Sequence, residues 1–239
     1  MIATTIVHDS RPVLLVGGAK VKKKLLSAAI VDGTRIVAAD GAANRLIKRG
    51  VLPDAVIGDM DSLSSAAREV LPEGRIHRIE EQDSTDFEKC LSRIEAPLVV
   101  ALGFSGGRLD HQLAVLHGMM RYADRPCLLV GKREVVFLAP PRIEVGLPAG
   151  CRVSLFPMAP VGARSEGLAW PLDGLDFEPG RQIGTSNRVA GEGGEVAVRI
   201  EVESPSMMVI LPVACFAAVR TVLRDPGLAR WAAPRPDPR

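Results

Sequence analysis

The chain has 239 residues, of which 47% are hydrophobic and 24% charged, so it can bury one large core or two ordinary ones. Thirty basic residues against 28 acidic ones leave a net charge of +2, which argues against a protein that binds nucleic acid through its bulk charge. The dense basic run consists of Lys20, Lys22, Lys23 and Lys24. Such a run is most often a solvated helix face.

The cysteines lie far apart in the sequence and form no C-x-x-C pair. They are Cys90, Cys127, Cys151 and Cys215. Neither a zinc site nor a redox pair is therefore predicted, and we expect inert thiols packed in the core. The sequence starts without a signal peptide and contains no apolar stretch of about 18 residues. We expect a cytoplasmic protein that has no membrane partner.

Apolar runs typical of buried strands alternate with helical segments over the first 140 residues. Strands are predicted at 12–18, 35–40, 54–59, 97–103 and 126–131. Helices are predicted at 22–30, 42–50, 62–71, 84–94 and 108–123. Thr85 precedes Glu88 by three residues, which indicates a capping box. Continuous apolar runs separated by helices are typical of a parallel sheet covered on both faces, so we predict an α/β domain at 1–140.

Near residue 140 the pattern changes to short β-rich pieces separated by glycine and proline. The segment 195–203 alternates with a period of two residues. Strands of this kind without helices between them are typical of a small antiparallel sandwich, which we place at 141–222. The remaining segment, 223–239, ends in a proline- and charge-rich tail. We expect this extension to be partly disordered.

Five aspartates lie where these predicted strands end or the following helices begin. They are Asp40, Asp59, Asp61, Asp86 and Asp110. Ligands of an open parallel sheet bind beyond the carboxyl ends of the strands, so all five should line one edge. Each acid alone could be only a helix cap or a turn residue. Asp59 and Asp61 argue otherwise, because one cap needs one carboxylate, and a cluster of oxygen ligands favours Mg²⁺.

A glycine-rich turn, GFSGGR at 103–108, is a candidate phosphate cradle. The backbone N–H groups of Gly106 and Gly107 can face an anion, the following helix adds the positive end of its dipole, and Arg108 offers a bidentate fork. Many glycine-rich turns are only tight turns, so the motif is weak by itself. The common nucleotide-binding fingerprints G-x-x-x-x-G-K-[ST] and G-x-G-x-x-G are absent from the sequence.

Six motifs resemble thiamine pyrophosphokinases in order and approximate spacing. They are ADGAANRL (39–46), IGDMDS (57–62), DSTDFEKCL (83–91), GFSGGRLDH (103–111), GLAWPLDG (167–174) and GTSN (184–187). The resemblance covers about residues 13–190. It implies a Rossmann-like nucleotide-binding domain, a β-sandwich that binds thiamine, and a homodimer with thiamine at its interface. The implied reaction transfers the diphosphoryl group of ATP to the hydroxyl of thiamine and releases AMP.

The resemblance also implies roles for individual residues. The five aspartates match the family's acidic positions, and we predict that Asp59, Asp61 and Asp86 hold Mg²⁺ while Asp40 belongs to the ATP site. The other predicted nucleotide and phosphate contacts are Gln82, Thr85, Gly106, Gly107 and Arg108. Asp110 would orient or deprotonate the thiamine hydroxyl, or act as a further metal ligand. The sequence leaves both roles open.

For thiamine, the resemblance implies contacts from Ser186 and Asn187. Thiamine is a cation with an aromatic ring, so an acidic pocket with aromatic walls suits it. Trp170 is a candidate wall, although a tryptophan in this motif can equally be a core residue of the sandwich. His111 either faces the site or is a packed or solvated histidine.

The sequence departs from the family pattern in two places. The segment after Asp110 and His111 reads QLAVL and lacks the asparagine that bacterial members often carry there. The C-terminal segment runs past the family's usual final strand and is a candidate extra helix. Neither departure touches the five acids.

Two other functions compete with this interpretation. D-x-D after an apolar strand is also found in haloacid-dehalogenase-type phosphatases, in which the first aspartate attacks phosphorus. That motif usually begins the first strand of its fold and continues into Thr or Val, whereas here it ends the third predicted strand and continues into Ser62. The second competitor is a nucleotide- or thiamine-sensing module without turnover. A pure binder, however, has no need of a complete set of acids.

Overall fold

The computed structural model describes residues 4–31 and 33–233. The chain forms two compact units, and the first passes into the second between Lys132 and Arg133. This boundary lies a few residues before the one predicted near residue 140. An α/β unit followed by a β unit agrees with the predicted fold class at this level. None of the helices in the described residues is long and apolar enough to cross a membrane.

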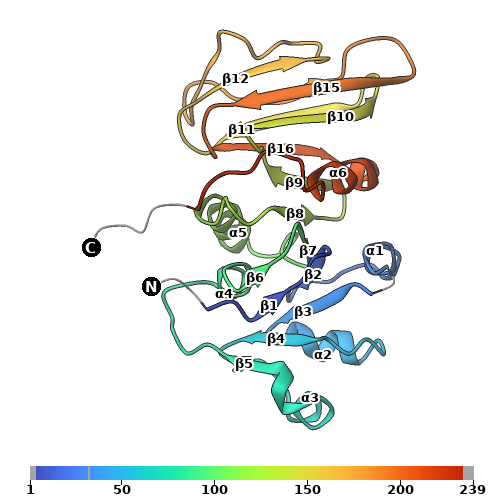
Figure 1. Ribbon diagram of the computed structural model, residues 1–239, viewed down its shortest axis with the longest axis vertical. Helices are drawn as coiled ribbons and strands as arrows, with labels where there is room; N and C mark the ends of the chain where they lie inside the picture. Colours follow the sequence, from blue (N-terminus) through green and yellow to red (C-terminus); the bar gives the residue numbers. More distant parts are fainter. Residues whose placement is uncertain (1–3, 32, 234–239) are drawn as a thin grey trace. The chain divides into compact units, whose positions relative to one another are not determined.

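Six strands of the first unit pair side by side in parallel (Figure 1). Their order is β8 (Cys127–Val130), β7 (Val99–Leu102), β2 (Val13–Val16), β3 (Arg35–Ala39), β4 (Ala55–Gly58) and β5 (Ile76–Arg78). The order reverses between β2 and β7, where an open sheet binds its ligands. Of these described strands, four lie on one side of the reversal and two on the other, whereas the standard Rossmann order has three on each side.

The strands of the first unit bury the apolar runs that predicted them. Every residue of β2, β4, β7 and β8 is buried, as expected where both faces of a parallel sheet are covered. The short edge strand β5 was not predicted. It contains His77 and Arg78 and is only partly buried, so it carries no continuous apolar run.

The helices of the first unit are shorter than the sequence pattern predicted. They are α1 (Lys23–Ala29), α2 (Ala42–Ile47), α3 (Ser65–Val70), α4 (Asp86–Leu91) and α5 (Leu109–Arg121), with a 3₁₀ turn η1 at Glu73–Arg75. In Figure 1, α1 and α2 lie on one face of the sheet and α4 and α5 on the other. The capping box is confirmed, because Thr85 and Glu88 each accept from the other's backbone N–H. Two further strands, β1 (Val7–His8) and β6 (Ile94–Glu95), form a short parallel pair.

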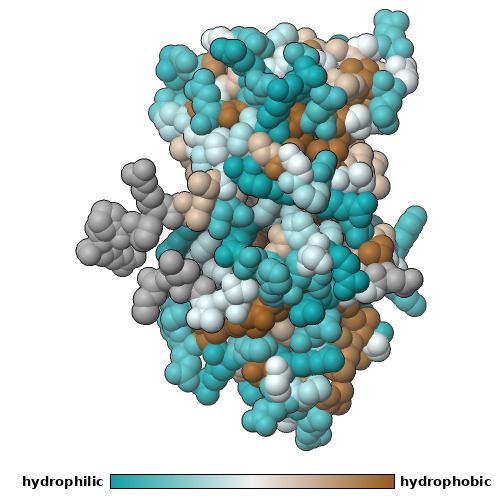
Figure 2. Space-filling model, viewed as in Figure 1, coloured by the Kyte–Doolittle hydropathy of each residue, from teal (hydrophilic) through white to brown (hydrophobic). Residues whose placement is uncertain are grey.

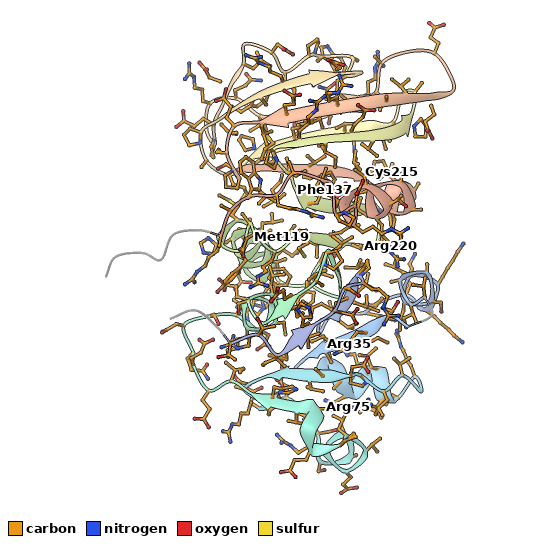
Figure 3. All side chains as sticks on the ribbon, viewed as in Figure 1. Arg35, Arg75, Met119, Phe137, Cys215 and Arg220 are labelled. Carbon is orange, nitrogen blue, oxygen red and sulfur yellow. The ribbon has the colours of Figure 1, made fainter. Side chains whose placement is uncertain are left out.

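The second unit consists mainly of antiparallel strands. One group is ordered β10 (Arg142–Pro148), β15 (Glu195–Val202), β12 (Val161–Glu166) and β13 (Asp176–Phe177). The other is ordered β14 (Gly184–Arg188), β11 (Arg152–Pro157), β16 (Met207–Pro212) and β9 (Glu134–Leu138). Phe137 of β9, labelled in Figure 3, is only 1% exposed and lies in the core of this unit.

Helical structure follows the last strand, β16. A 3₁₀ turn η2 (Val213–Cys215) leads into α6 (Phe216–Leu223), which is the additional helix that the sequence suggested. The segment beyond α6 is held by side chains: Arg230 donates to the carbonyl of Leu223, and the Trp231 indole donates to the carbonyl of Ala139 at 2.8 Å. The last part of the predicted disordered tail, 234–239, lies outside the described residues.

Candidate active site

Three carboxylates meet at the carboxyl ends of β3 and β4. These strands are parallel neighbours, with Asp40 directly after β3 and Asp59 directly after β4. One oxygen from each of Asp40, Asp59 and Asp61 lies within 4.8 Å of the other two. Two oxygens on opposite sides of one Mg²⁺ are about 4 Å apart, so a small side-chain adjustment would bring this set around a single ion.

Two glycines let the loops that carry these acids approach each other. A Cβ on Gly58 would lie 2.7 Å from the Cβ of Asp40, and a Cβ on Gly41 would lie 2.8 Å from the Cβ of Ser62. Both distances are shorter than carbon atoms tolerate, so any larger residue would push the loops apart.

The D-x-D loop has a strained backbone that neighbouring side chains hold in place. Met60, between the two aspartates, has φ of 70° and is 4% exposed. Arg68 donates to the Met60 carbonyl at 2.7 Å. Asn44 of α2 donates to the Ser62 carbonyl at 2.8 Å and accepts from the N–H of Ser64. A positive φ in a bulky residue is uncommon, and strain of this kind persists at sites where the surrounding structure imposes it.

Asp40 is the most deeply buried of the three acids. It is 2% exposed and has φ of 42°. The backbone N–H of Ser62 donates to Oδ2 at 3.2 Å, while Oδ1 is buried without a hydrogen-bond partner among the described residues. Burial, the facing Asp61 carboxylate and the negative charge of Asp86 raise the pKa of Asp40 to about 6. A buried carboxylate oxygen that accepts no hydrogen bond is suited to bind a cation, so this donor set fits Mg²⁺.

Asp59 is held in its ionised form. The backbone N–H of Asp61 donates to Asp59 Oδ1 at 3.2 Å, and this bond lowers the pKa of Asp59, helped by Lys89 and Gln82 and opposed by desolvation. The Nζ atom of Lys89, from α4, lies 3.7 Å from Asp59 Oδ2. Lys89 was not singled out from the sequence. A lysine in the apolar stretch FEKCL was the available signal, because buried lysines are rare without a partner.

Asp86 stands apart from this group of three, although the sequence predicted it as a metal ligand in place of Asp40. It is accessible to solvent in the first turn of α4. Protein atoms still crowd its carboxylate. This desolvation, with repulsion from Asp59 and Asp61, raises the pKa of Asp86, and Lys89 opposes the shift. Asp86 is therefore a neighbouring charge of the cluster.

The two remaining predicted residues of this region have different positions. Thr85 caps α4 through Glu88, so its hydroxyl is engaged within the helix end. Gln82 is exposed and lies close enough to Asp59 to help lower the pKa of that carboxyl. Gln82 thus lies beside the acids, whereas Thr85 positions the helix that carries Asp86 and Lys89.

The glycine-rich turn after β7 is exposed, and open space surrounds Gly106 and Gly107. Arg108 and Asp110 are both exposed and bind each other, with Arg108 Nε 3.1 Å from Asp110 Oδ1. This pairing lowers the pKa of Asp110. In the described part of the chain, no hydrogen bond or ion pair joins Arg108 or Asp110 to the three clustered acids. The ring contact of Phe87 and Phe104, at 5.0 Å, ties the turn to α4.

A separate cavity lies in the second unit. Its volume is about 400 Å³, and both the predicted thiamine-binding stretch and Trp170 line it. Trp170 is 56% exposed, so the alternative that it is a core residue is wrong. The guanidinium of Arg188 lies 5.3 Å from the centre of the Trp170 ring. The cavity lining combines apolar and aromatic side chains with polar residues such as Thr185 and Ser186.

The two predicted thiamine contacts differ in their surroundings. Asn187 is 5% exposed; its Nδ2 donates to the Trp170 carbonyl at 2.7 Å, and its Oδ1 accepts from the N–H groups of Trp170 and Arg188. Its polar atoms thus brace the cavity wall. Ser186 is exposed, has φ of 63°, and bonds through its backbone N–H to the hydroxyl of Ser154. Ser186 is also one of the residues that line the cavity.

Comparison with protein families identifies both units. Residues 27–130 match the family described as "Thiamin pyrophosphokinase, catalytic domain", and residues 142–207 match "Thiamin pyrophosphokinase, vitamin B1 binding domain". Thiamine pyrophosphokinase 1 of Oryza sativa subsp. japonica is 30% identical over 191 residues, covering 65% of this chain and 72% of the relative. Thiamin pyrophosphokinase 1 of Caenorhabditis elegans is 28% identical over 173 residues, covering 64% and 70%.

Solved structures show the same fold. Thiamin pyrophosphokinase from Geobacillus thermodenitrificans superposes with a TM-score of 0.70 at 24% identity, over 84% of this chain and 97% of that one. The yeast enzyme superposes with a TM-score of 0.68 at 20% identity, over 85% and 87%. With both domains matched in order along the sequence and the fold shared, this chain belongs to the thiamin pyrophosphokinase family.

Proposed function

We propose that the carboxylates of Asp40, Asp59 and Asp61 form the centre at which this chain transfers the diphosphoryl group of ATP to the hydroxyl of thiamine, giving thiamine diphosphate and AMP. Membership of the thiamin pyrophosphokinase family is the observation that supports this reaction. The cluster of the three carboxylates beyond β3 and β4 is the observation that supports the location of the site. Asp40 and Met60 both have positive φ at this sheet edge, and functional sites commonly store such strain.

Asp40, Asp59 and Asp61 would hold Mg²⁺, with Asp86 as a fourth acid facing them. The unpartnered buried oxygen of Asp40 supports its place as a ligand. Bound Mg²⁺ neutralises charge on the phosphates during transfer. In this proposal Asp40 takes the place that the sequence-based set of Asp59, Asp61 and Asp86 gave to Asp86. Lys89, paired with Asp59, offsets part of the negative charge that this arrangement concentrates.

The phosphate chain would lie along the glycine-rich turn. The N–H groups of Gly106 and Gly107 and the guanidinium of Arg108 are suited to the transferred group. Asp110 is suited to orient the thiamine hydroxyl or accept its proton. Arg108 and Asp110 hydrogen-bond each other in the structure, so a ligand that binds either side chain must compete with this pair. Gln82, beside Asp59, and the helix end capped by Thr85 complete the proposed ATP site.

Thiamine would bind in the cavity of the second domain. Trp170 offers an aromatic face to a cationic ring, and Ser186 lines the same cavity with a hydroxyl that can hydrogen-bond a ligand. Asn187 holds the Trp170 backbone, so its contribution to thiamine binding is indirect. The domain limits 1–140 and 141–222, with an extension at 223–239, remain the predicted division of these roles.

The family resemblance further predicts a homodimer with thiamine at its interface and a cytoplasmic location. Sedimentation velocity of the purified chain tests the first prediction: a single species of monomer mass at assay concentrations contradicts it. Fractionation of cells that produce the chain from its own gene tests the second.

The reaction itself is tested by incubating the protein with ATP, Mg²⁺ and thiamine and separating the products by chromatography. We expect equal amounts of AMP and thiamine diphosphate, both abolished by EDTA. Asp59→Asn should lower turnover at least about hundredfold at saturating Mg²⁺. Near-normal turnover of this variant would show that Asp59 is not a metal ligand.

The same chromatogram separates the competing functions. ADP with thiamine monophosphate would leave the fold and the acids in place but contradict the transferred group. Slow release of phosphate alone, with beryllofluoride bound at Asp59, would support the phosphatase. Tight binding of both substrates without any product would support the sensing module.

A further inference from the structure

The loop after β2 and the helix α2 carry a concentration of positive charge that the proposed reaction has not used. Lys20, Lys22, Lys23 and Lys24 are all exposed. On α2 and just beyond it, Arg45, Lys48 and Arg49 are exposed as well. Among the described residues, none of these seven side chains forms an ion pair with a carboxylate. In a protein with a net charge of only +2, this surface is locally strongly basic.

The loop lies between the two parts of the proposed ATP site. Strand β2 pairs with β7 on one side and with β3 on the other, all in parallel. At the carboxyl edge, the loop that leaves β2 therefore lies between the glycine-rich turn after β7 and Asp40 after β3. Direct contacts agree with this topology: Gly17 N–H donates to the Leu102 carbonyl at 2.7 Å, and Ala19 N–H donates to the Gly103 carbonyl at 2.9 Å.

The base of the loop is anchored, although its lysines are exposed. Arg45 Nη1 donates to the Gly18 carbonyl, and Arg49 Nη2 donates to the Val21 carbonyl at 2.9 Å. Val21 itself is 8% exposed, so the loop is also held by a buried side chain. Lys20 and Lys22 flank this anchor on both sides. Their ammonium groups are thus carried by an ordered backbone.

A solvated helix face does not account for the whole run. Helix α1 begins at Lys23, with Lys22 at its N-cap position, and buries Leu26 and Ala29. Lys20 and Lys22 precede the helix and belong to the loop at the sheet edge. Hydrophilic side chains project into solvent beside α1 in Figure 2, as expected for the two lysines within the helix.

The acids create a need for positive charge in this position. Asp40, Asp59 and Asp61 meet within 4.8 Å, and among the described residues only Lys89 forms an ion pair with this group. One Mg²⁺ and Lys89 together balance the three clustered carboxylates, so the charge of Asp86 and the negative charges of a triphosphate itself remain without a counter-charge. Ammonium groups within reach of the middle of the phosphate chain would offset these charges.

We infer that Lys20 and Lys22 bind the polyphosphate tail of the nucleotide where it passes between the glycine-rich turn and the three clustered acids. This inference rests on the proposed location of the ATP site. The remaining basic residues of α1 and α2 act at longer range, by raising the local concentration of the anionic nucleotide. Lys20 and Lys22 are thereby specificity-determining residues for a nucleoside triphosphate over a monophosphate.

The test compares ATP with AMP, which lacks the two outer phosphates. Dissociation constants for both nucleotides are measured by calorimetry with Mg²⁺ and without thiamine, for the parent chain and for Lys20→Gln/Lys22→Gln. We expect ATP affinity to fall about tenfold or more while AMP affinity changes less than twofold. Lys20→Arg/Lys22→Arg should retain most of the ATP affinity, because the charge is kept.

A matched control removes the same charge elsewhere. Arg142 and Arg164 are exposed on β10 and β12, the two strands that flank β15 in the second unit, and both lie opposite Glu201. Arg142→Gln/Arg164→Gln lowers the net charge equally and should leave both affinities unchanged. Equal losses in the control and the lysine variant, or equal losses for ATP and AMP, would overturn the inference.

The outcome is separable from that of the proposed reaction. If the parent chain forms thiamine diphosphate but the lysine variant binds ATP as tightly as the parent, the inference is wrong and the reaction stands. If the parent forms no product yet loses ATP affinity selectively in the lysine variant, the lysines bind the phosphates and the proposed reaction is wrong.

Discussion

The Lys89 ammonium group lies 3.7 Å from Asp59 Oδ2, although only 3% of the Lys89 side chain is exposed. Lysine is rarely buried this deeply unless it is paired. Helix α4 presents Lys89 from its last turn and Asp86 from its first. One short helix therefore brings both a positive and a negative charge to the D-x-D loop.

Removing this charge should destabilise the metal-free protein. Lys89→Met fills a similar volume but leaves Asp59 without its cation among three other carboxylates. We expect the free energy of unfolding to fall by about 2 kcal/mol in EDTA, less than for a fully buried pair because 22% of the Asp59 side chain is exposed. Urea denaturation measures this value, and saturating Mg²⁺ should restore much of it. Equal stability of variant and parent in EDTA would show that the pair contributes nothing.

Asp40→Asn should stabilise the metal-free fold at neutral pH while abolishing activity. Asparagine tolerates the left-handed conformation of this residue and keeps an acceptor for the Ser62 N–H. The pKa of Asp40 is raised from 3.8 to about 6, so the folded state keeps a proton that the unfolded chain has already released. Its unfavourable contribution to folding therefore grows as the pH rises from about 4 to about 6 and is complete above that.

The variant should accordingly match or fall below the parent in stability at pH 4 and exceed it by up to about 2 kcal/mol at pH 7.5. Urea denaturation in EDTA at these two pH values is the measurement. A gain that is the same at both values would contradict the assignment of the raised pKa to Asp40.

Asn187→Ala should weaken both the fold and thiamine binding. The substitution leaves the Trp170 carbonyl and the N–H groups of Trp170 and Arg188 without their partner. Unsatisfied buried groups of this kind cost about 2 kcal/mol, and the loosened cavity wall should raise the KM for thiamine. Ser186→Ala provides the contrast, because we expect its stability to stay within about 0.5 kcal/mol of the parent while the thiamine KM still rises. A thiamine KM unchanged in both variants would exclude this cavity as the thiamine site.

Mild oxidation should join Cys151 to Cys215. Their sulfur atoms are 3.5 Å apart, Cys151 is half-buried, and burial together with Cys151 raises the pKa of Cys215 to about 12 (Cys215 is labelled in Figure 3). Hydrogen peroxide would convert the Cys151 thiol to a sulfenic acid with release of one water. Attack by the Cys215 sulfur would then release a second water and close the disulfide.

Mass spectrometry should find the loss of two hydrogen atoms in a peptide pair that contains both residues, reversed by dithiothreitol. Cys90 and Cys127 are buried and serve as internal controls that should remain thiols. Stable sulfenic or sulfinic acid at Cys151 without the cross-link would contradict the geometry. The sequence led us to expect four inert core thiols, because a sulfur pair separated by 64 positions leaves no local pattern.

Local patterns were sufficient for the parts of the molecule that depend on near neighbours. Buried parallel strands carry continuous apolar runs, and a capping box needs only Thr85 and Glu88 at the correct spacing, so these elements were predictable. The edge strand β5 was missed because an edge strand has one partner and need not be apolar. Helix lengths were overestimated because packing, and not propensity alone, decides where short helices end.

The sequence by itself determined which residues could carry the chemistry. Each acid of the site follows a strand or begins a helix, and strands and helices can be predicted from patterns of consecutive residues. Tertiary structure decided which of those residues meet. Asp40 joined Asp59 and Asp61 because β3 and β4 are neighbours and Gly41 and Gly58 let their loops touch. Lys89 joined them because α4 packs against both of these strands. Lys89 and Asp59 are thirty positions apart in the sequence, so their contact depends on this packing and cannot be predicted from the residues next to either one.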